Sequence, residues 1–380
     1  MSHFPLERLN EQETPFYYYD MSLLRRTLAA VKQHAPQGSE VHYALKANSN
    51  PLLLQVIAEQ GLGADCVSGG EIARAIKSGI APGRIVYSGV GKTDREIRQA
   101  LQAGIACFNV ESVAELDVID MIAADCGVIA PIALRVNPHV DAHTHHYITT
   151  GMSENKFGID LSMLDDAVTH ALSLSHVRMR GLHFHIGSQI VAMQPFEVLC
   201  EVVNKLSSDL EQRGVAIDYI NVGGGLGVDY SNPDVQSIPD FATYFSLFAR
   251  NIKLPQGATL HFELGRSIVC QCGSLITRVL YVKQGLNKQF VIVDAGMTDL
   301  IRQALYQSEH RIENITSHEA PATYDVVGPI CESSDSFGSD IVLPATRRGD
   351  LLAIRSAGAY GEAMAMQYNG RSLPSSLCVE

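Results

Sequence analysis

Hydrophobic residues recur in short runs along residues 40–263, and helical patterns or loops separate each run from the next. Eight runs have the length and composition of strands: Glu40–Lys46, Gly63–Val67, Arg84–Tyr87, Cys107–Val110, Pro131–Val136, Met179–His185, Tyr219–Val222 and Thr259–Glu263. Amphipathic spacing predicts helices between them: Pro51–Gln60, Gly69–Lys77, Asp94–Ala103, Ser112–Ala124, Leu161–Leu172, Pro195–Gln212 and Pro239–Asn251. This alternation predicts an α/β fold, a parallel (β/α)8 barrel of the TIM type.

The chain on both sides of these runs has a different pattern. An aromatic strand is expected at Phe16–Tyr19, where it would pair with a second domain, and an amphipathic helix at Ser22–His34. Valine-rich and isoleucine-rich strands and one short helix are expected after Arg266: Leu275–Lys283, Gln289–Ala295, Asp299–Tyr306 (the helix), Ala322–Val327 and Asp350–Arg355. We expect residues 21–268 to form the barrel, and residues 1–20 plus 269–380 to form a mainly β, β-barrel-like domain.

One lysine ends the first run of the barrel. In VHYALKANSN (41–50), apolar and other residues alternate as in a half-buried strand, and Pro51 begins the next helix. Lys46 is therefore expected at the carboxyl end of a strand. An apolar environment favours the neutral amine that Schiff-base chemistry requires. The alternative, which is commoner for a lone lysine, is a packed stem with its ammonium group in water.

Polar or glycine residues follow nearly every predicted strand. In a (β/α)8 barrel the active site gathers at the carboxyl ends of the strands. Those ends carry Lys46, Asp65, Ser88, Asn109, Arg135, Asn137, His185, Gly223, Gly224, Gly225, Glu263 and Arg266. A lysine, a histidine, a glycine triplet and a carboxylate together indicate a catalytic site.

The loops after the seventh and eighth strands indicate an anion site. Gly223–Gly225 and Gly265 allow close approach of the backbone, and Arg266 can bind phosphate or carboxylate through two nitrogens. A tight turn under the barrel rim is the alternative for the glycines. With Lys46 to form an imine, Glu263 to pair with a pyridine nitrogen and His185 to lie against the ring, these are the parts that pyridoxal phosphate needs. A core histidine is the alternative for His185.

Composition excludes several other classes of function. The chain has 380 residues, 46% of them hydrophobic, and a net charge of −12 without a basic run, so neither nucleic acid nor a membrane is an expected partner. The eight scattered cysteines are expected to be mostly buried free thiols, and the protein is expected to be cytoplasmic. No metal is expected at His139, His143, His145 and His146, which lack a neighbouring cysteine or paired carboxylate.

Seven motifs in order are similar to those of the diaminopimelate decarboxylases, a family of fold-type III pyridoxal-phosphate decarboxylases. They are YALKAN (43–48), DCVSGGE (65–71), NKFGI (155–159), HFHIGSQ (183–189), GGGLG (223–227), GPICESSD (328–335) and AGAYG (357–361). The resemblance implies a carboxy-lyase that converts meso-2,6-diaminopimelate to L-lysine and CO2, the last step of lysine biosynthesis.

The resemblance also implies a role for each matching residue. Lys46 would hold pyridoxal 5'-phosphate as an imine, and the cofactor would also contact Asp65, His185, Ser188, Gly223, Gly224, Gly225, Glu263, Gly265, Arg266 and Tyr360. Arg266, Arg302, Tyr306, Glu332 and Tyr360 would bind the substrate, with Glu332 holding its distal amine. Cys331 would donate the proton. Cys331 and Glu332 would reach into the active site of a neighbouring subunit, so a homodimer with shared sites is expected.

Two positions depart from the family's pattern, and two alternative functions are open. Leu264 and Gln303 stand where proline is frequent in the family. A related decarboxylase of ornithine, lysine or carboxynorspermidine is one alternative, although ornithine and lysine have no distal carboxylate for Arg302. A catalytically silent paralogue that acts by binding partners is the other, and the presence of Lys46, Glu263 and Cys331 argues against it.

Overall fold

The computed structural model of the chain describes residues 4–140 and 156–380. Its residues form two compact units. The barrel unit comprises residues 28–227 and 239–265, and the β unit comprises residues 1–27, 228–238 and 266–380. The domain limits expected from the sequence stay a prediction, because compactness alone does not show that a segment folds independently.

The barrel unit contains a closed parallel sheet, which confirms the predicted (β/α)8 fold. Its eight barrel strands pair in the order β2-β3-β4-β5-β6-β8-β9-β10, and β10 pairs with β2 to close the barrel. The strands are β2 (Glu40–Ala44), β3 (Gly63–Cys66), β4 (Ile85–Tyr87), β5 (Cys107–Val110), β6 (Ala130–Asn137), β8 (Val177–His183), β9 (Tyr219–Asn221) and β10 (Thr259–Leu264). The short β7 (Ile159–Asp160) pairs with β6 at the edge of this sheet.

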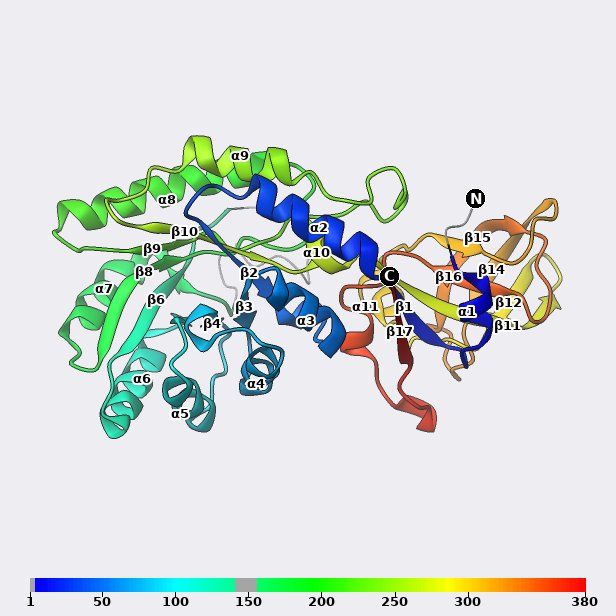
Figure 1. Cartoon of the computed structure of the whole chain (residues 1–380), viewed down its shortest axis with the longest axis horizontal. Helices are drawn as coiled ribbons and strands as arrows, with labels where there is room; N and C mark the ends of the chain where they lie inside the picture. Colours follow the sequence, from blue (N-terminus) through cyan, green and yellow to red (C-terminus); the bar gives the residue numbers. More distant parts are fainter. Residues whose placement is uncertain (1–3, 141–155) are drawn as a thin grey trace. The chain divides into compact units, whose positions relative to one another are not determined.

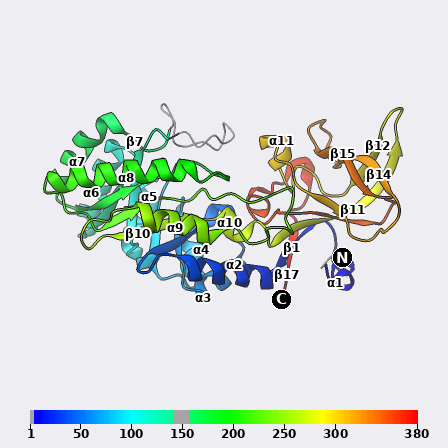
Figure 2. The ribbon, with the colours of Figure 1, turned by 90° about the horizontal axis from the view of Figure 1, so that it is seen from above.

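Helices surround these strands (Figure 1). They are α3 (Pro51–Glu59), α4 (Gly69–Lys77), α5 (Asp94–Ala103), α6 (Val113–Cys126), α7 (Leu164–Ser173), α8 (Gln194–Gln212) and α9 (Phe241–Asn251), and α2 (Met21–His34) precedes β2. Helices α8 and α9 lie side by side (Figures 1 and 2), and Phe196 meets Tyr244 edge-on with ring centroids 5.2 Å apart. Among the described residues, no helix is both long and apolar enough to cross a membrane.

The first barrel strand differs from its prediction in two ways. Val41 through Leu45 are all buried, rather than alternately buried and exposed. A parallel barrel strand has packed neighbours on both faces, so it need not alternate. The strand also ends at Ala44, and Lys46 lies in the single turn of 3-10 helix η1 (Leu45–Ala47) that follows. Lys46 therefore starts the loop above the strand.

Local signals explain why the helices start where they do. The Asn50 side chain accepts a hydrogen bond from the Leu52 N–H, directly before α3, and Pro51 occupies the first turn. Thr93 and Glu96 form a reciprocal capping box at α5. These contacts fix the loops that follow β2 and β4, where two predicted site residues, Lys46 and Ser88, lie.

The β unit is a mainly β structure, as predicted. Its strands are β1 (Phe16–Asp20), β11 (Gly273–Gln284), β12 (Gln289–Val293), β13 (Ile312–Asn314), β14 (Pro321–Val327), β15 (Ser336–Pro344), β16 (Leu351–Ile354) and β17 (Ser375–Val379), and its helices are α1 (Leu6–Asn10), α10 (Arg266–Val269) and α11 (Arg302–Tyr306). The predicted pairing of the aromatic strand is confirmed, because β1 joins β11 and β17. The pattern missed β13, β15 and β17. Strand β13 has only three residues, and exposed positions in β15 and β17 weaken the hydrophobic signal.

Candidate functional site

Lys46 pairs with a buried carboxylate in the barrel unit. Its Nζ lies 3.3 Å from Asp65 Oδ2, and the Asp65 side chain is fully buried while the Lys46 side chain is 37% exposed. Burial and the nearby Glu263 carboxylate raise the pKa of Asp65, and Lys46 opposes that shift. The lysine thus lies at an accessible position above a buried acid.

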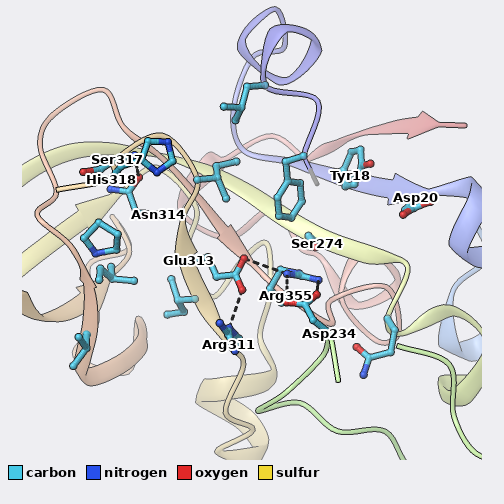
Figure 3. Close-up of a pocket in the computed structure, with 18 of the residues that line it drawn as sticks. Tyr18, Asp20, Asp234, Ser274, Arg311, Glu313, Asn314, Ser317, His318 and Arg355 are labelled. Carbon is cyan, nitrogen blue, oxygen red and sulfur yellow. Dashed lines mark hydrogen bonds and ion pairs between the residues drawn. The ribbon is translucent and has the colours of Figure 1, made fainter. Parts of the chain in front are cut away.

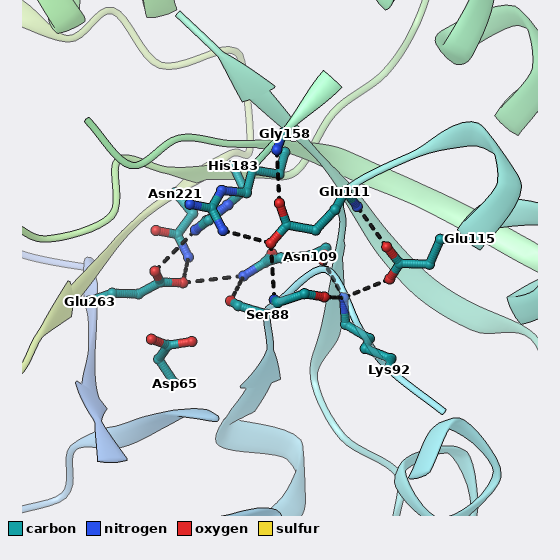
Figure 4. A network of polar contacts seen from close by, with 12 residues as sticks. Asp65, Ser88, Lys92, Asn109, Glu111, Glu115, Gly158, His183, Asn221 and Glu263 are labelled. Atoms are coloured by element: carbon teal, nitrogen blue, oxygen red, sulfur yellow. Dashed lines mark hydrogen bonds and ion pairs between the residues drawn. The ribbon is translucent and has the colours of Figure 1, made fainter. Parts of the chain in front are cut away.

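The Glu263 carboxylate at the end of β10 is held by side chains from three other strands (Figure 4). Its Oε1 accepts hydrogen bonds from Asn221 Nδ2 at 2.8 Å and Asn109 Nδ2 at 3.2 Å. Its Oε2 lies 3.0 Å from His183 Nε2. Although burial acts to raise it, the His183 ring and Lys46 hold the pKa of Glu263 well below its usual value. Glu263 is therefore ionised beside an Asp65 that binds a proton more readily.

The glycine loop after β9 packs tightly against neighbouring strand ends. A Cβ on Gly224 would stand 1.8 Å from the Glu263 carbonyl oxygen, and Gly223 has a φ of +70°. The Gly224 N–H points at His185 Nδ1, 3.3 Å away. The glycines thus form a tight turn, and this turn also lies beside the predicted site residues Glu263 and His185.

His185 follows β8 rather than ending it, because the strand stops at His183. Loss of hydration and the charges of Lys46 and Arg135 lower the pKa of His185 well below its usual value. A neutral ring results, which is suited to lie against an aromatic cofactor. Ser188 lies three residues further along the same loop. Gly265 packs against Ala44, because a Cβ added to Gly265 would stand 3.1 Å from the Ala44 Cβ.

A second polar network adjoins this site in Figure 4. Arg135 Nη1 lies 2.6 Å from Glu111 Oε1, and both side chains are buried. Lys92 is buried too, and its Nζ donates to Glu115 Oε1 at 2.6 Å and to two backbone carbonyl oxygens. With three acceptors for its three hydrogens, the Lys92 ammonium group is fully used.

In the β unit, Tyr230 joins two of the predicted arginines. Its phenol oxygen accepts hydrogen bonds from Arg302 Nη2 at 3.2 Å and from Arg266 Nη1. The Tyr360 ring lies against the Arg266 guanidinium, with 4.7 Å between the ring centroid and Arg266 Cζ. The Tyr306 ring centroid lies 5.7 Å from Arg302 Cζ. Four of the predicted residues of this unit thus cluster, with the two arginines joined by a tyrosine that the sequence did not single out.

Cys331 and Glu332 lie on an exposed turn of the β unit. The Tyr368 hydroxyl donates to Glu332 Oε1 at 2.5 Å, and the Cys331 N–H donates to Asn369 Oδ1 at 3.4 Å. The Ser334 hydroxyl also donates to Glu332 Oε2 at 3.4 Å, so these hydrogen bonds go to Ser334 and residues 368–369 rather than to the arginine cluster. This exposure is compatible with the predicted contribution to a neighbouring subunit, which stays a prediction.

A polar cavity of about 760 Å³ also lies in the β unit (Figure 3). Arg355 inside it lies 2.7 Å from Asp234 and 3.1 Å from Glu313, and Arg311 lies 2.8 Å from Glu313. Both arginines of this cavity are thus paired with carboxylates, and its described lining includes no predicted site residue.

The described residues contain no cluster of side chains suited to a metal ion. His139 Nε2 lies 2.7 Å from Asp160 Oδ2. The other three histidines of that stretch, His143, His145 and His146, lie outside the described residues, as does Asn155 of the NKFGI motif.

Sequence reasoning missed His183, Asn221 and Tyr230. His183 and Asn221 each lie two residues before a predicted site residue, His185 and Gly223, so strand periodicity placed them close to the site. Tyr230 follows the glycine loop without any regular pattern, and only the folded chain brings it to the arginines.

Comparisons with known proteins agree with this geometry. Residues 21–270 match the family model described as pyridoxal-dependent decarboxylase, pyridoxal binding domain. A diaminopimelate decarboxylase of Bacteroides thetaiotaomicron is 57% identical over 98% of this chain and 97% of its own. The structure of the Helicobacter pylori diaminopimelate decarboxylase complexed with L-lysine has a TM-score of 0.93 at 43% identity, covering 99% of this chain and 94% of that one. A lysine/ornithine decarboxylase of Vibrio vulnificus, at 22% identity and a TM-score of 0.84, shares the fold.

Proposed function

This chain belongs to the diaminopimelate decarboxylase family of pyridoxal-dependent decarboxylases, and we propose that it converts meso-2,6-diaminopimelate to L-lysine and CO2. One observation in the β unit carries the choice of substrate. The Arg302 side chain is buried, yet its hydrogen bonds go to the neutral groups of Tyr230, Ser308 and His310, and no carboxylate among the described residues pairs with it. A buried cation of this kind needs an anion. A substrate that retains a second carboxylate supplies one.

The barrel unit fits pyridoxal phosphate. A carboxylate has about two acceptor positions on each oxygen, and the hydrogen bonds to Glu263 fill both on Oε1 but one on Oε2. One position thus remains for a protonated pyridine nitrogen. Asp65 Oδ1 is buried without a hydrogen-bond partner among the described residues, which indicates a missing donor. When bound, pyridoxal phosphate accepts the electron pair that the departing carboxylate leaves.

We assign the cofactor contacts as follows. Lys46 binds the cofactor covalently, and Asp65, through its ion pair, holds the Lys46 amine in place. The neutral His185 ring packs against the pyridine ring, and Glu263 keeps the pyridine nitrogen protonated. The phosphate is bound by Ser188, Gly223, Gly224, Gly225, Gly265 and Arg266, with Tyr360 beside it.

We assign the substrate contacts to the other predicted residues. Arg302, with Tyr306 and Arg266, binds the retained carboxylate, and Tyr360 lines the same site. Glu332 binds the distal ammonium group, and the Cys331 thiol delivers a proton to the carbon from which CO2 departs. Because Cys331 and Glu332 are exposed on their turn, we propose that they act in the site of a second subunit of a homodimer. All eight cysteines are free, which supports a reducing, cytoplasmic location.

A substrate panel tests the proposal. Release of CO2 should be measured from meso-diaminopimelate, L-lysine, L-ornithine and carboxynorspermidine, with the Arg302→Gln variant as a matched comparison. We expect diaminopimelate to react with the highest kcat/KM, and Arg302→Gln to reduce that value about 100-fold or more. Faster turnover of ornithine, or no CO2 from any compound, would exclude the proposed activity.

A further inference from the structure

We propose that His183 is a positioning residue for this decarboxylation, and that its hydrogen bond keeps Glu263 ionised and oriented toward the pyridine nitrogen. The inference rests on the proposed function, which assigns Glu263 that partner. It adds a residue that the resemblance did not name.

The geometry around Glu263 singles out His183. Asn109 and Asn221, from β5 and β9, both donate to Oε1, at 3.2 and 2.8 Å. His183, from β8, contacts Oε2 at 3.0 Å, the oxygen that retains an open acceptor position. The His183 ring is 1% exposed, so no water competes for this contact. His183 thus sets the direction of the oxygen that remains available.

A histidine differs from the two asparagines in the charge that its side chain can carry. Either neutral or protonated, His183 donates from Nε2, and only a histidine among the three donors can add a positive charge. Its Nδ1 is buried without a hydrogen-bond partner among the described residues, so the contact with Glu263 selects the tautomer. Within the described part of the chain, the His183 ring makes no other hydrogen bond that competes with this role.

Loss of His183 would change the charge state of Glu263. A buried carboxylate that has Asp65 nearby and loses one of three donors binds a proton more readily. Protonated Glu263 would act as a donor toward the pyridine nitrogen rather than as an acceptor. The ring would then accept electrons less well, which lowers kcat, whereas substrate contacts in the β unit would be unchanged.

Paired substitutions separate this role from space filling. We expect His183→Leu to lower kcat about 100-fold with a KM for diaminopimelate within about threefold of the parent. His183→Gln, which retains a donor at similar reach, should stay within about tenfold. His261→Gln, which changes a buried histidine bonded to His42 instead, is the matched control.

A spectrum and a double substitution test the role of His183 further. The visible absorption of the bound cofactor should change with pH in His183→Leu but not in His183→Gln, because Glu263 titrates only in the former. In a Glu263→Gln background, His183→Leu should cause no further loss of kcat. If His183→Leu fails to fold, His183→Asn, whose shorter amide does not reach Oε2, replaces it in the same comparison.

The outcomes distinguish the inference from the proposed function. If the parent binds no cofactor or releases no CO2, the proposed function is wrong. If the parent is active, and either His183→Leu retains its kcat and spectrum or its effect adds fully to that of Glu263→Gln, the inference about His183 alone is wrong.

Discussion

Arg302 Nη2 lies 3.2 Å from the phenol oxygen of Tyr230 and donates a hydrogen bond to it. The same oxygen accepts a hydrogen bond from Arg266. Two buried guanidinium groups therefore share one neutral acceptor, and Tyr230 sets the distance between them. Since we assign Arg266 to the phosphate and Arg302 to the substrate, Tyr230 connects the two binding functions.

Tyr230→Phe keeps the ring and removes the shared oxygen. We expect KM for diaminopimelate to rise about tenfold, because one hydrogen bond to a charged group contributes about 1.5 kcal/mol, and we expect kcat to change less. Steady-state kinetics would measure both. Tyr281→Phe, at an exposed tyrosine of the same unit, is the control. An unchanged KM would mean that packing alone positions the arginines.

The exposed turn with Cys331 predicts complementation between inactive subunits. Lys46→Ala and Cys331→Ala should each be nearly inactive as homodimers. When they are mixed and allowed to exchange subunits, each heterodimer should contain one intact site, which restores about a quarter of the parent activity in an equal mixture. Cys126→Ala, at a partly buried cysteine, is the control for thiol loss. If the mixture stays inactive although heterodimers form, the sites are not shared.

Gly224 should tolerate no side chain. A Cβ there would stand 1.8 Å from the Glu263 carbonyl oxygen, so Gly224→Ala must displace the loop or the end of β10. We expect a loss of cofactor affinity of at least tenfold and a lower Tm. Gly91→Ala is the matched control, because nothing lies within 4 Å of an added Cβ at that position. Unchanged cofactor binding in Gly224→Ala would contradict the packing described for this loop.

A buried histidine of the barrel predicts acid sensitivity. Burial and the His42 ring lower the pKa of His261 from 6.5 to about 2. Below pH 6.5, His261 therefore binds a proton in the unfolded chain but stays neutral in the folded chain. The contribution of neutral His261 to the free energy of unfolding is complete above pH 6.5 and falls as the pH drops below it.

Between pH 7.5 and pH 5, the free energy of unfolding should fall by about 2 kcal/mol because of His261. Urea unfolding at both pH values should show that His261→Gln loses about 2 kcal/mol less than the parent does over this interval. An equal loss in parent and variant would show that His261 is protonated in the folded protein.

The sequence predicts the barrel and much of its site for a physical reason. Strands of a parallel barrel are buried on both faces, so they remain visible as apolar runs, and residues after each run must meet at one end of the barrel. This logic located Lys46, Asp65 and Glu263, and the structure brings these three residues close together.

Other parts depend on contacts that no periodicity records. Lys46 lies in a 3-10 turn between β2 and α3 rather than in the strand, and the alternating pattern of residues 41–45 does not show where the strand ends. Only two of the nine positions of strand β15 are buried, so its hydrophobic pattern is weak. Tyr230 reaches Arg302 from 72 residues away in the sequence, and only tertiary folding creates that contact.

Covalent attachment of the cofactor to Lys46 is the central claim. The protein should be loaded with pyridoxal phosphate, reduced with borohydride, digested and analysed by peptide mass spectrometry. We predict a stable pyridoxyl adduct on Lys46 and none on Lys92, whose three hydrogens are already donated to protein oxygens. An unmodified Lys46, or an adduct on another lysine, would contradict the account.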